Sequence, residues 1–227
     1  MNKFKALLIG FIAFFSMELY AQNIFFPTEV GTVLTYVQRD ARGRFEHYTR
    51  QTITAVERSG NEMIISYLTE TLDRNRRVTN EINGRIIIRA GKMIFDIESM
   101  IAARIPEDSR ANVEISGSFI ELPLEMSVGQ RFDDSELTIS VERGIVRMNV
   151  VMRVTDVQCL AIENVTVEAG TFRARKVTQT ISTTALRRTN TSRIISWSAP
   201  NIGQVQSRTY DHRDRLQNTT ELIEIRR

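Results

Sequence analysis

The chain has 227 residues, of which 42% are hydrophobic and 25% are charged, and its formal net charge is +3. This is the composition of a globular protein, and it excludes a disordered, collagen-like or multi-span membrane protein. Two His and one Cys leave almost no room for a zinc site, a disulfide scaffold or a c-type haem, and the balanced charge argues against a nucleic-acid partner.

The first 21 residues are typical of a secretory signal peptide. Two lysines precede the apolar run Ala6–Phe15, and a short mixed stretch ends at Ala21. The run is shorter than the ~20 residues that a membrane span needs, so we expect cleavage after Ala21 and no transmembrane span in the mature chain. The only Cys, Cys159, lies far downstream. The sequence therefore predicts an exported protein without a lipid anchor.

The remaining residues, 22–227, are predicted to form a single β domain. Thr, Val, Ile and aromatic residues dominate it, in runs that end at Gly, Asn, Asp or Pro. In the first half, Asn83-Gly84 is the strongest hairpin signal, and Glu98–Ala103 is the one plausible short helix. The strands predicted there are Thr32–Arg39, Phe45–Glu57, Met63–Asp73, Val78–Ile82, Arg85–Arg89, Lys92–Ile97, Asn112–Ile115 and Phe119–Leu122.

The second half continues in the same way. Between Val146 and Val154 apolar and polar residues alternate, which predicts a strand with one dry and one wet face. The strands predicted for this half are Glu136–Glu142, Ile145–Gln158, Ala161–Val167, Phe172–Ser182, Thr189–Ser198, Gln204–Asp211 and Leu216–Ile225. Few connections leave room for a helix, so we predict an all-β fold. About 14 strands would form a curved, mostly antiparallel sheet or a partly closed barrel.

Two segments of similar sequence raise the question of an internal repeat. Phe26–Gly31 and Leu122–Gly129 both contain an early Pro and a final Val-Gly, and each precedes two long predicted strands. One interpretation is a pair of related halves, 22–110 and 111–227. The other is that any two β-meanders look alike.

Residue types that perform chemistry are sparse. His47 lies in the middle of a predicted strand, and His212 lies in an Asp-rich and Arg-rich turn. Cys159 stands among apolar residues, which favours a buried, inert thiol over a nucleophile. We therefore predict no catalytic residue, no metal ion and no cofactor.

Two later segments are more distinctive. In Glu163–Val177, Gly170 is expected to take a positive φ in a tight turn. The loop after the only Trp, Trp197, contains Pro200 and Asn201. It could be a binding lip with Trp197 as an aromatic platform and these three residues touching a ligand. It could instead be a plug that closes one end of the sheet, which is the interpretation we favour.

Taken in order, these motifs resemble the exported bacterial β-proteins grouped as domain-of-unknown-function 3108-like families. The resemblance rests on the motifs at Pro27–Tyr36, Leu122–Gly129, Glu163–Phe172, Trp197–Val205 and Tyr210–Leu222. It covers nearly the whole mature chain and implies a curved antiparallel β fold in the periplasm, or outside the cell, of a Gram-negative bacterium. It implies no reaction, because the family has no established catalytic residues. Glu168 departs from the pattern, which has Pro at that position.

Three functional hypotheses follow. The first is a non-catalytic envelope protein whose concave face binds an amphipathic ligand such as a lipid. The second is a structural module, or one that binds another envelope protein, with a filled core. The third is a hydrolase of an envelope polymer, which would need two carboxylates converging in a cleft. An open apolar cleft would distinguish the first hypothesis from the second.

The signal-peptide assignment has a direct test. In protein exported by its native host, we expect mass spectrometry to find Gln22 as the first residue, because the small residue Ala21 ends the predicted segment. An intact Met1 in the envelope fraction would contradict cleavage and would favour an uncleaved anchor.

Overall fold

The computed structural model describes residues 24–97, 113–117, 121–143 and 146–227. The predicted signal peptide and the predicted helix at Glu98–Ala103 lie outside these residues. The described strands are β1 (Val33–Asp40), β2 (Phe45–Ser59), β3 (Glu62–Leu72), β4 (Val78–Arg89), β5 (Lys92–Phe95), β6 (Val113–Gly117), β7 (Glu121–Pro123), β8 (Ser135–Arg143), β9 (Val146–Val167), β10 (Gly170–Ala185), β11 (Arg188–Ala199), β12 (Gly203–Asp211) and β13 (Leu216–Arg226).

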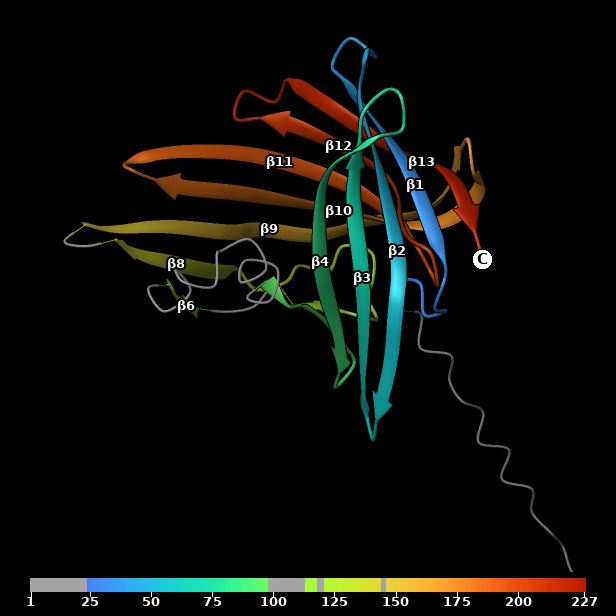
Figure 1. The fold of residues 1–227 in the computed structure, drawn as a ribbon, viewed down its shortest axis with the longest axis horizontal. Coiled ribbons are helices and arrows are strands. Elements are labelled where there is room, and N and C mark those ends of the chain that lie inside the picture. Colours follow the sequence, from blue (N-terminus) through green and yellow to red (C-terminus); the bar gives the residue numbers. More distant parts are fainter. Residues whose placement is uncertain (1–23, 98–112, 118–120, 144–145) are drawn as a thin grey trace, which may run out of the picture.

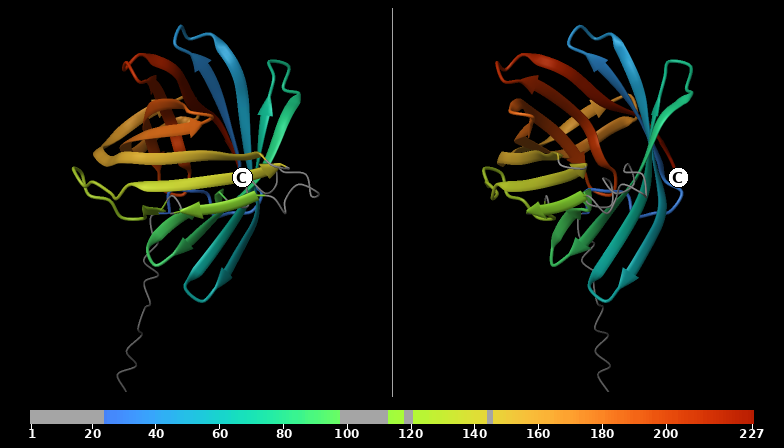
Figure 2. Two further views of the ribbon diagram at one scale, coloured as in Figure 1. Left: turned by 90° about the vertical axis from the view of Figure 1, so that its left-hand side faces the viewer. Right: turned by 60° about the vertical axis from the view of Figure 1, so that its left-hand side comes forward.

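All these strands belong to one sheet of 13, in the order β6-β8-β9-β10-β11-β12-β13-β1-β2-β3-β4-β5-β7. Each named pair is antiparallel, so the predicted all-β, curved antiparallel fold is confirmed. The first strand, β1, pairs with the last, β13, in the middle of the sheet. In Figure 1, β8–β11 cross β2–β4 at a steep angle, and Figure 2 shows the sheet curling around its interior.

The two edge strands explain the curl. The edges are β6 and β7, which are neighbours in sequence and are separated only by residues 118–120. A link of that length spans at most about 14 Å between Gly117 and Glu121. The chain therefore holds the two edges of the sheet close together, although no pairing between β6 and β7 closes it.

Two predicted strand boundaries were wrong. β9 runs unbroken for 22 residues where the sequence suggested two strands. Bulges in its pairing with β10, and Asp156 at a φ of 55°, let this long strand bend instead of ending. The predicted hairpin at Asn83-Gly84 is also absent, because β4 pairs continuously with β3 through both residues.

Gly84 serves a packing purpose inside β4. It lies opposite Tyr67 of β3, and a Cβ built on Gly84 would lie 2.4 Å from Cζ of the Tyr67 ring. The ring is buried and packs against Phe26 with a centroid separation of 5.2 Å. The glycine therefore provides the space in which the tyrosine ring lies over the neighbouring strand.

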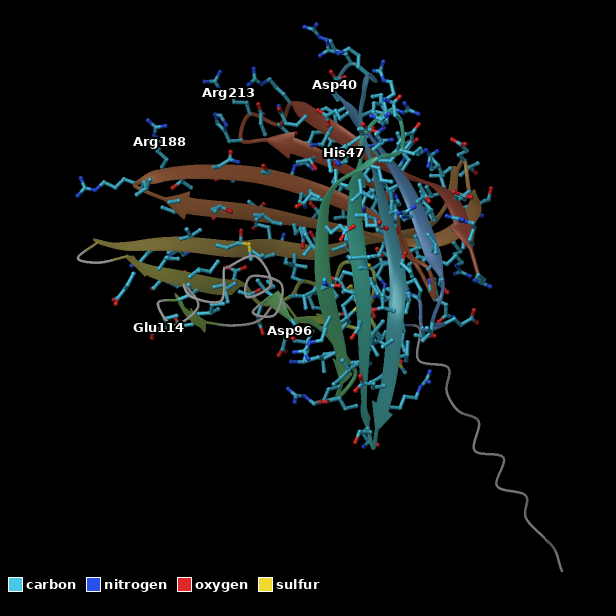
Figure 3. The ribbon with its side chains drawn as sticks, in the orientation of Figure 1. Asp40, His47, Asp96, Glu114, Arg188 and Arg213 are labelled. Atoms are coloured by element: carbon cyan, nitrogen blue, oxygen red, sulfur yellow. The ribbon has the colours of Figure 1, made fainter. Side chains whose placement is uncertain are left out.

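Three hairpins turn through the same Asp-x-x-x-Arg sequence, at Asp40–Arg44, Asp73–Arg77 and Asp211–Arg215. In each turn Oδ1 of the Asp accepts hydrogen bonds from the backbone N–H groups two and four residues later, with N–O distances of 2.8–2.9 Å. The bonds from Arg215 to Asp211 lower the pKa of that carboxyl to about 2. Figure 3 places Asp40 and Arg213 near one end of the sheet. The predicted polar turn around His212 is thus confirmed.

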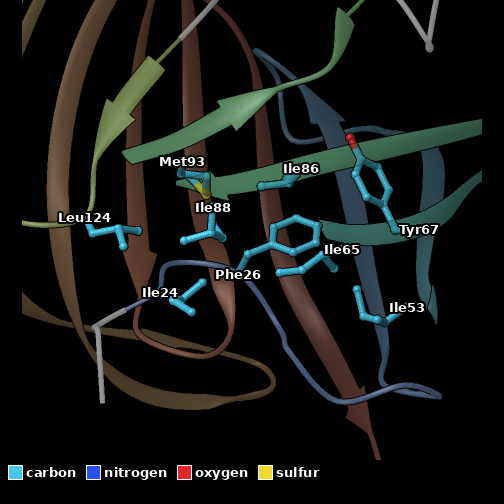
Figure 4. Close-up of a cluster of buried hydrophobic side chains, with 9 residues drawn as sticks. All are labelled: Ile24, Phe26, Ile53, Ile65, Tyr67, Ile86, Ile88, Met93 and Leu124. Atoms are coloured by element: carbon cyan, nitrogen blue, oxygen red, sulfur yellow. The ribbon is translucent and has the colours of Figure 1, made fainter. Parts of the chain in front are cut away.

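Two hydrophobic clusters hold the sheet. The first joins β2–β5 to the segment before β1, and its buried members, drawn in Figure 4, are Ile24, Phe26, Ile53, Ile65, Tyr67, Ile86, Ile88, Met93 and Leu124. The second comprises Leu34, Tyr36, Ala174, Trp197, Ala199, Val205 and Leu222. The end of the β9–β10 hairpin covers this second cluster, and its Ala169 N–H donates to the Leu222 carbonyl at 3.3 Å.

Gly84→Ala should destabilise the protein by about 1–3 kcal/mol, because the new methyl group overlaps the Tyr67 ring. Urea unfolding measures the change. In a Tyr67→Ala background the same substitution should cost much less, since the obstructing ring is absent. Equal costs in the two backgrounds would contradict this packing explanation.

A cavity on the concave face

The curled sheet encloses a cavity of about 470 Å³. Its walls come from strands that are distant in sheet order, with β10–β13 on one side, β5 and β7 on another, and β1 and β2 contributing between them. In a single curved sheet, strands that are this far apart can face the same space only if that space lies on the inside of the curve. The cavity therefore occupies the concave face.

One side of the cavity is polar. The pairing register sets Val177, Ser196 and Ser207 side by side across β10, β11 and β12. Side chains two residues along each strand point to the same face, so neighbouring rows line the cavity too. The polar lining residues are Thr49, Gln51, Gln179, Ser196, Ser198, Gln204, Ser207, Thr209 and Thr220. Hydroxyl and amide groups on this side can both donate and accept hydrogen bonds.

The opposite side is apolar and continues into the first hydrophobic cluster. Phe26, Met93 and Leu124 belong both to that cluster and to the lining. The apolar residues on this side are Phe25, Phe26, Met93, Phe95, Leu122, Pro123, Leu124 and Met126. Both segments that the sequence analysis singled out as similar, Phe26–Gly31 and Leu122–Gly129, therefore contribute to the same cavity wall.

These two similar segments also form matching hydrogen bonds. The Gly31 amide donates to the Ile53 carbonyl at 2.9 Å, and the Gly129 amide donates to the Cys159 carbonyl at 2.7 Å. In each case the strand residue returns a bond to the carbonyl of the residue after the glycine, at 2.9 and 3.0 Å. The shared geometry supports two related halves, which stay a prediction.

The segment before β1 is held in place by the β11–β12 turn. The Asn201 amide donates to the Ile24 carbonyl at 2.7 Å. Gly203, at a φ of +89°, lies so close that a Cβ there would be 3.3 Å from the Phe25 carbonyl oxygen. This turn therefore positions Phe25 and Phe26, which line the cavity.

Arg175, on β10, is the one charged residue among the described residues that line the cavity. Its Nη2 donates to the Leu124 carbonyl at 2.9 Å, and its Cζ lies 3.8 Å from the centroid of the Phe25 ring. Its Nε is buried and has no hydrogen-bond partner. Desolvation lowers the pKa of this guanidinium, although an arginine stays protonated.

The sequence analysis did not identify Arg175. One signal was available: strand alternation places it on the same face as Val177 and on the face opposite Ala174. Nothing in the sequence indicated which of those faces is concave.

The residues that were predicted to touch a ligand lie elsewhere. Trp197 points away from the cavity, because Ser196 and Ser198 on either side of it line that space. Its ring is 5% exposed within the second cluster, and its Nε1 donates to Glu163 at 2.7 Å. Pro200 and Asn201 form the turn described above and are not among the lining residues. A binding role for these three residues stays a prediction.

The remaining candidates are dispersed. His47 lies on β2 opposite Gln38, and His212 is exposed in its turn. Cys159 is buried, and burial raises the pKa of its thiol. Within the ranges that the structure describes, no three metal-binding side chains are grouped as a site, and no helix is long and apolar enough to cross a membrane.

Comparison with known proteins identifies both a family and a fold. The DUF3108-like family model matches residues 29–222. One similar crystal structure is "a putative exported protein with YmcC-like fold" from Bacteroides fragilis NCTC 9343. It is 22% identical with a TM-score of 0.69, and the match covers 89% of this chain and 99% of that one. Another is "a putative lipoprotein" from Parabacteroides distasonis ATCC 8503, 24% identical with a TM-score of 0.70, covering 89% and 98%. No curated protein sequence is significantly similar to the chain.

Gly203→Ala tests the role of the β11–β12 turn. Strain at positive φ should cost about 1 kcal/mol, with a further cost because the new Cβ presses on the Phe25 carbonyl. Gly43→Ala is the matched control, since Gly43 has a φ of +76° and no neighbouring atom within 4 Å. We expect urea unfolding to show the larger loss for Gly203→Ala. Equal losses would mean that the turn does not support the Phe25 segment.

Proposed function

We propose that this chain, which belongs to the DUF3108-like family, is an exported, non-catalytic protein that binds an amphipathic, lipid-like ligand on the concave face of its sheet. The observation that carries the proposal is the cavity. Its volume of about 470 Å³ lies within the range of ~300–1,000 Å³ that is usual for small-molecule sites.

The chemistry of the lining supports an amphipathic ligand. Phenylalanine, leucine and methionine side chains form one side, and serine, threonine and glutamine side chains, with Tyr36, Val177 and Ile194 among them, form the other. An apolar chain would lose its contact with water against the first side. Polar groups of the same molecule would find hydrogen-bond partners on the second. A purely structural module would be expected to fill this space with side chains.

Export is supported by two independent observations. The sequence begins with a typical signal peptide, and the two similar structures are described as an exported protein and as a lipoprotein. We propose that the mature protein acts in the periplasm or outside the cell.

Ser196→Phe tests the cavity as the binding site. This substitution places an aromatic ring in the lined space. The neutral fluorescent probe N-phenyl-1-naphthylamine should bind the mature wild-type protein saturably. The variant should bind it at least about tenfold more weakly, because the ring occupies the volume that the probe needs.

Ser192→Phe is the matched control. It introduces the same ring on the same strand, but Ser192 is not among the cavity residues. This variant should bind the probe as the wild type does, and circular dichroism should show that both variants are folded. Absence of saturable binding to folded wild-type protein would refute the proposal, as would unchanged binding by Ser196→Phe.

A further inference from the structure

Arg175 differs from two other arginines of the sheet, Arg50 and Arg85, which pair with buried acids. Arg50 forms a two-point contact with Glu70, with both bonds at 2.6 Å, and Arg85 contacts Asp96 at 2.6 Å. Both acids are buried, so these pairs neutralise charge inside the protein. Arg175 is partly buried and its Nε is fully buried, yet among the described residues no carboxylate forms an ion pair with it.

Within the protein, only part of the hydrogen-bonding capacity of the Arg175 guanidinium is used. A guanidinium has five N–H donors, and one of them reaches the Leu124 carbonyl. The Phe25 ring interacts with the flat face of the cation but accepts no conventional hydrogen bond from its edge. Cys159 and the exposed Glu125 are near enough to favour the charged form, but among the described residues neither forms a hydrogen bond or an ion pair with Arg175. A partly buried cation that lacks an ion-pair partner and most of its hydrogen bonds carries an uncompensated cost of desolvation.

An anionic ligand group would remove that cost. Carboxylates and phosphates are the groups that a guanidinium binds best, because its planar donors match their oxygen atoms. Arg175 is positioned for this role, since its contacts with Phe25 and Leu124 place it beside the apolar side of the cavity. A charged headgroup at Arg175 would therefore leave its attached chain next to that apolar side.

We propose that the cavity selects amphiphiles with an anionic headgroup, a carboxylate or a phosphate, and that Arg175 binds this group while the apolar chain lies along Phe26, Met93 and Leu124. The proposal rests on the proposed function, because it specifies the ligand class of the same cavity.

The test is displacement of N-phenyl-1-naphthylamine from the mature protein by three ligands of equal chain length: dodecanoate, dodecyl phosphate and dodecanol. At least one of the two anions should bind about tenfold or more tightly than dodecanol, the effect expected of a charge-assisted hydrogen bond. The tighter anion identifies the headgroup as a carboxylate or a phosphate.

The variants separate charge recognition from general affinity. Arg175→Gln should abolish the preference for the anions over dodecanol, and Arg175→Lys should retain part of that preference. Arg173→Gln is the matched control, because Arg173 lies on the same strand, is exposed and is not among the cavity residues. It should behave as the wild type does.

The outcomes distinguish the two proposals. If dodecanol displaces the probe but neither anion is preferred by the wild type, the anionic ligand class is refuted and the amphiphile-binding function stands. An anion preference that survives Arg175→Gln would likewise overturn the role of Arg175. If no ligand displaces the probe, or the probe does not bind, both proposals fail. Should Arg175→Gln not fold, Arg175→Lys and the wild-type comparison decide.

Discussion

The rest of the structure depends on the way in which the sheet is tethered to itself. Pairing between β1 and β13 joins the two ends of the described chain in the middle of the sheet, and the two edge strands, β6 and β7, follow each other closely in the sequence. A sheet of 13 strands under these two constraints cannot spread flat. It has to curl, and curling gives it a concave face on which residues from β5 and β11 meet across one cavity.

The two faces of the curled sheet differ in how well they are filled. Around Trp197 the end of the β9–β10 hairpin folds over β13, and aliphatic and aromatic side chains occupy the space between them. On the concave face, short Ser and Thr side chains stand opposite the Phe25–Phe26 segment and leave volume between them. A strand such as β11 thus contributes its odd-numbered residues to a packed core and its even-numbered ones to an open site.

The charged side chains follow the same contrast between well-packed regions and the open cavity. In the three Asp-x-x-x-Arg turns, backbone N–H groups donate to the carboxylate of the Asp, and in the first and third turns the side chain of the Arg donates as well. The buried acids Glu70 of β3 and Asp96, which follows β5, pair with arginines of the neighbouring strands β2 and β4. Arg175 is the exception, and its position in the cavity links the electrostatics of the fold to the ligand class that we propose.

The sequence by itself determined the strand-rich character of the chain, most strand boundaries and the polar turn around His212, and it predicts a signal peptide. These features depend on local composition and on alternation along a strand, which a short window of residues contains. It also singled out, as two segments of similar sequence, Phe26–Gly31 and Leu122–Gly129, which both contribute residues to the apolar side of the cavity. It did not reveal that the two segments meet.

Only the tertiary structure decided which face of each strand lines the cavity. Asn83-Gly84 has the local chemistry of a turn, yet Gly84 stays within β4 because the Tyr67 ring of another strand needs its space. Alternation separates Trp197 from Ser196, but which of the two faces inward depends on the direction in which the whole sheet curls. That direction is set by pairings between residues far apart in the chain, such as Val33 with Arg226, and no short stretch of sequence contains them.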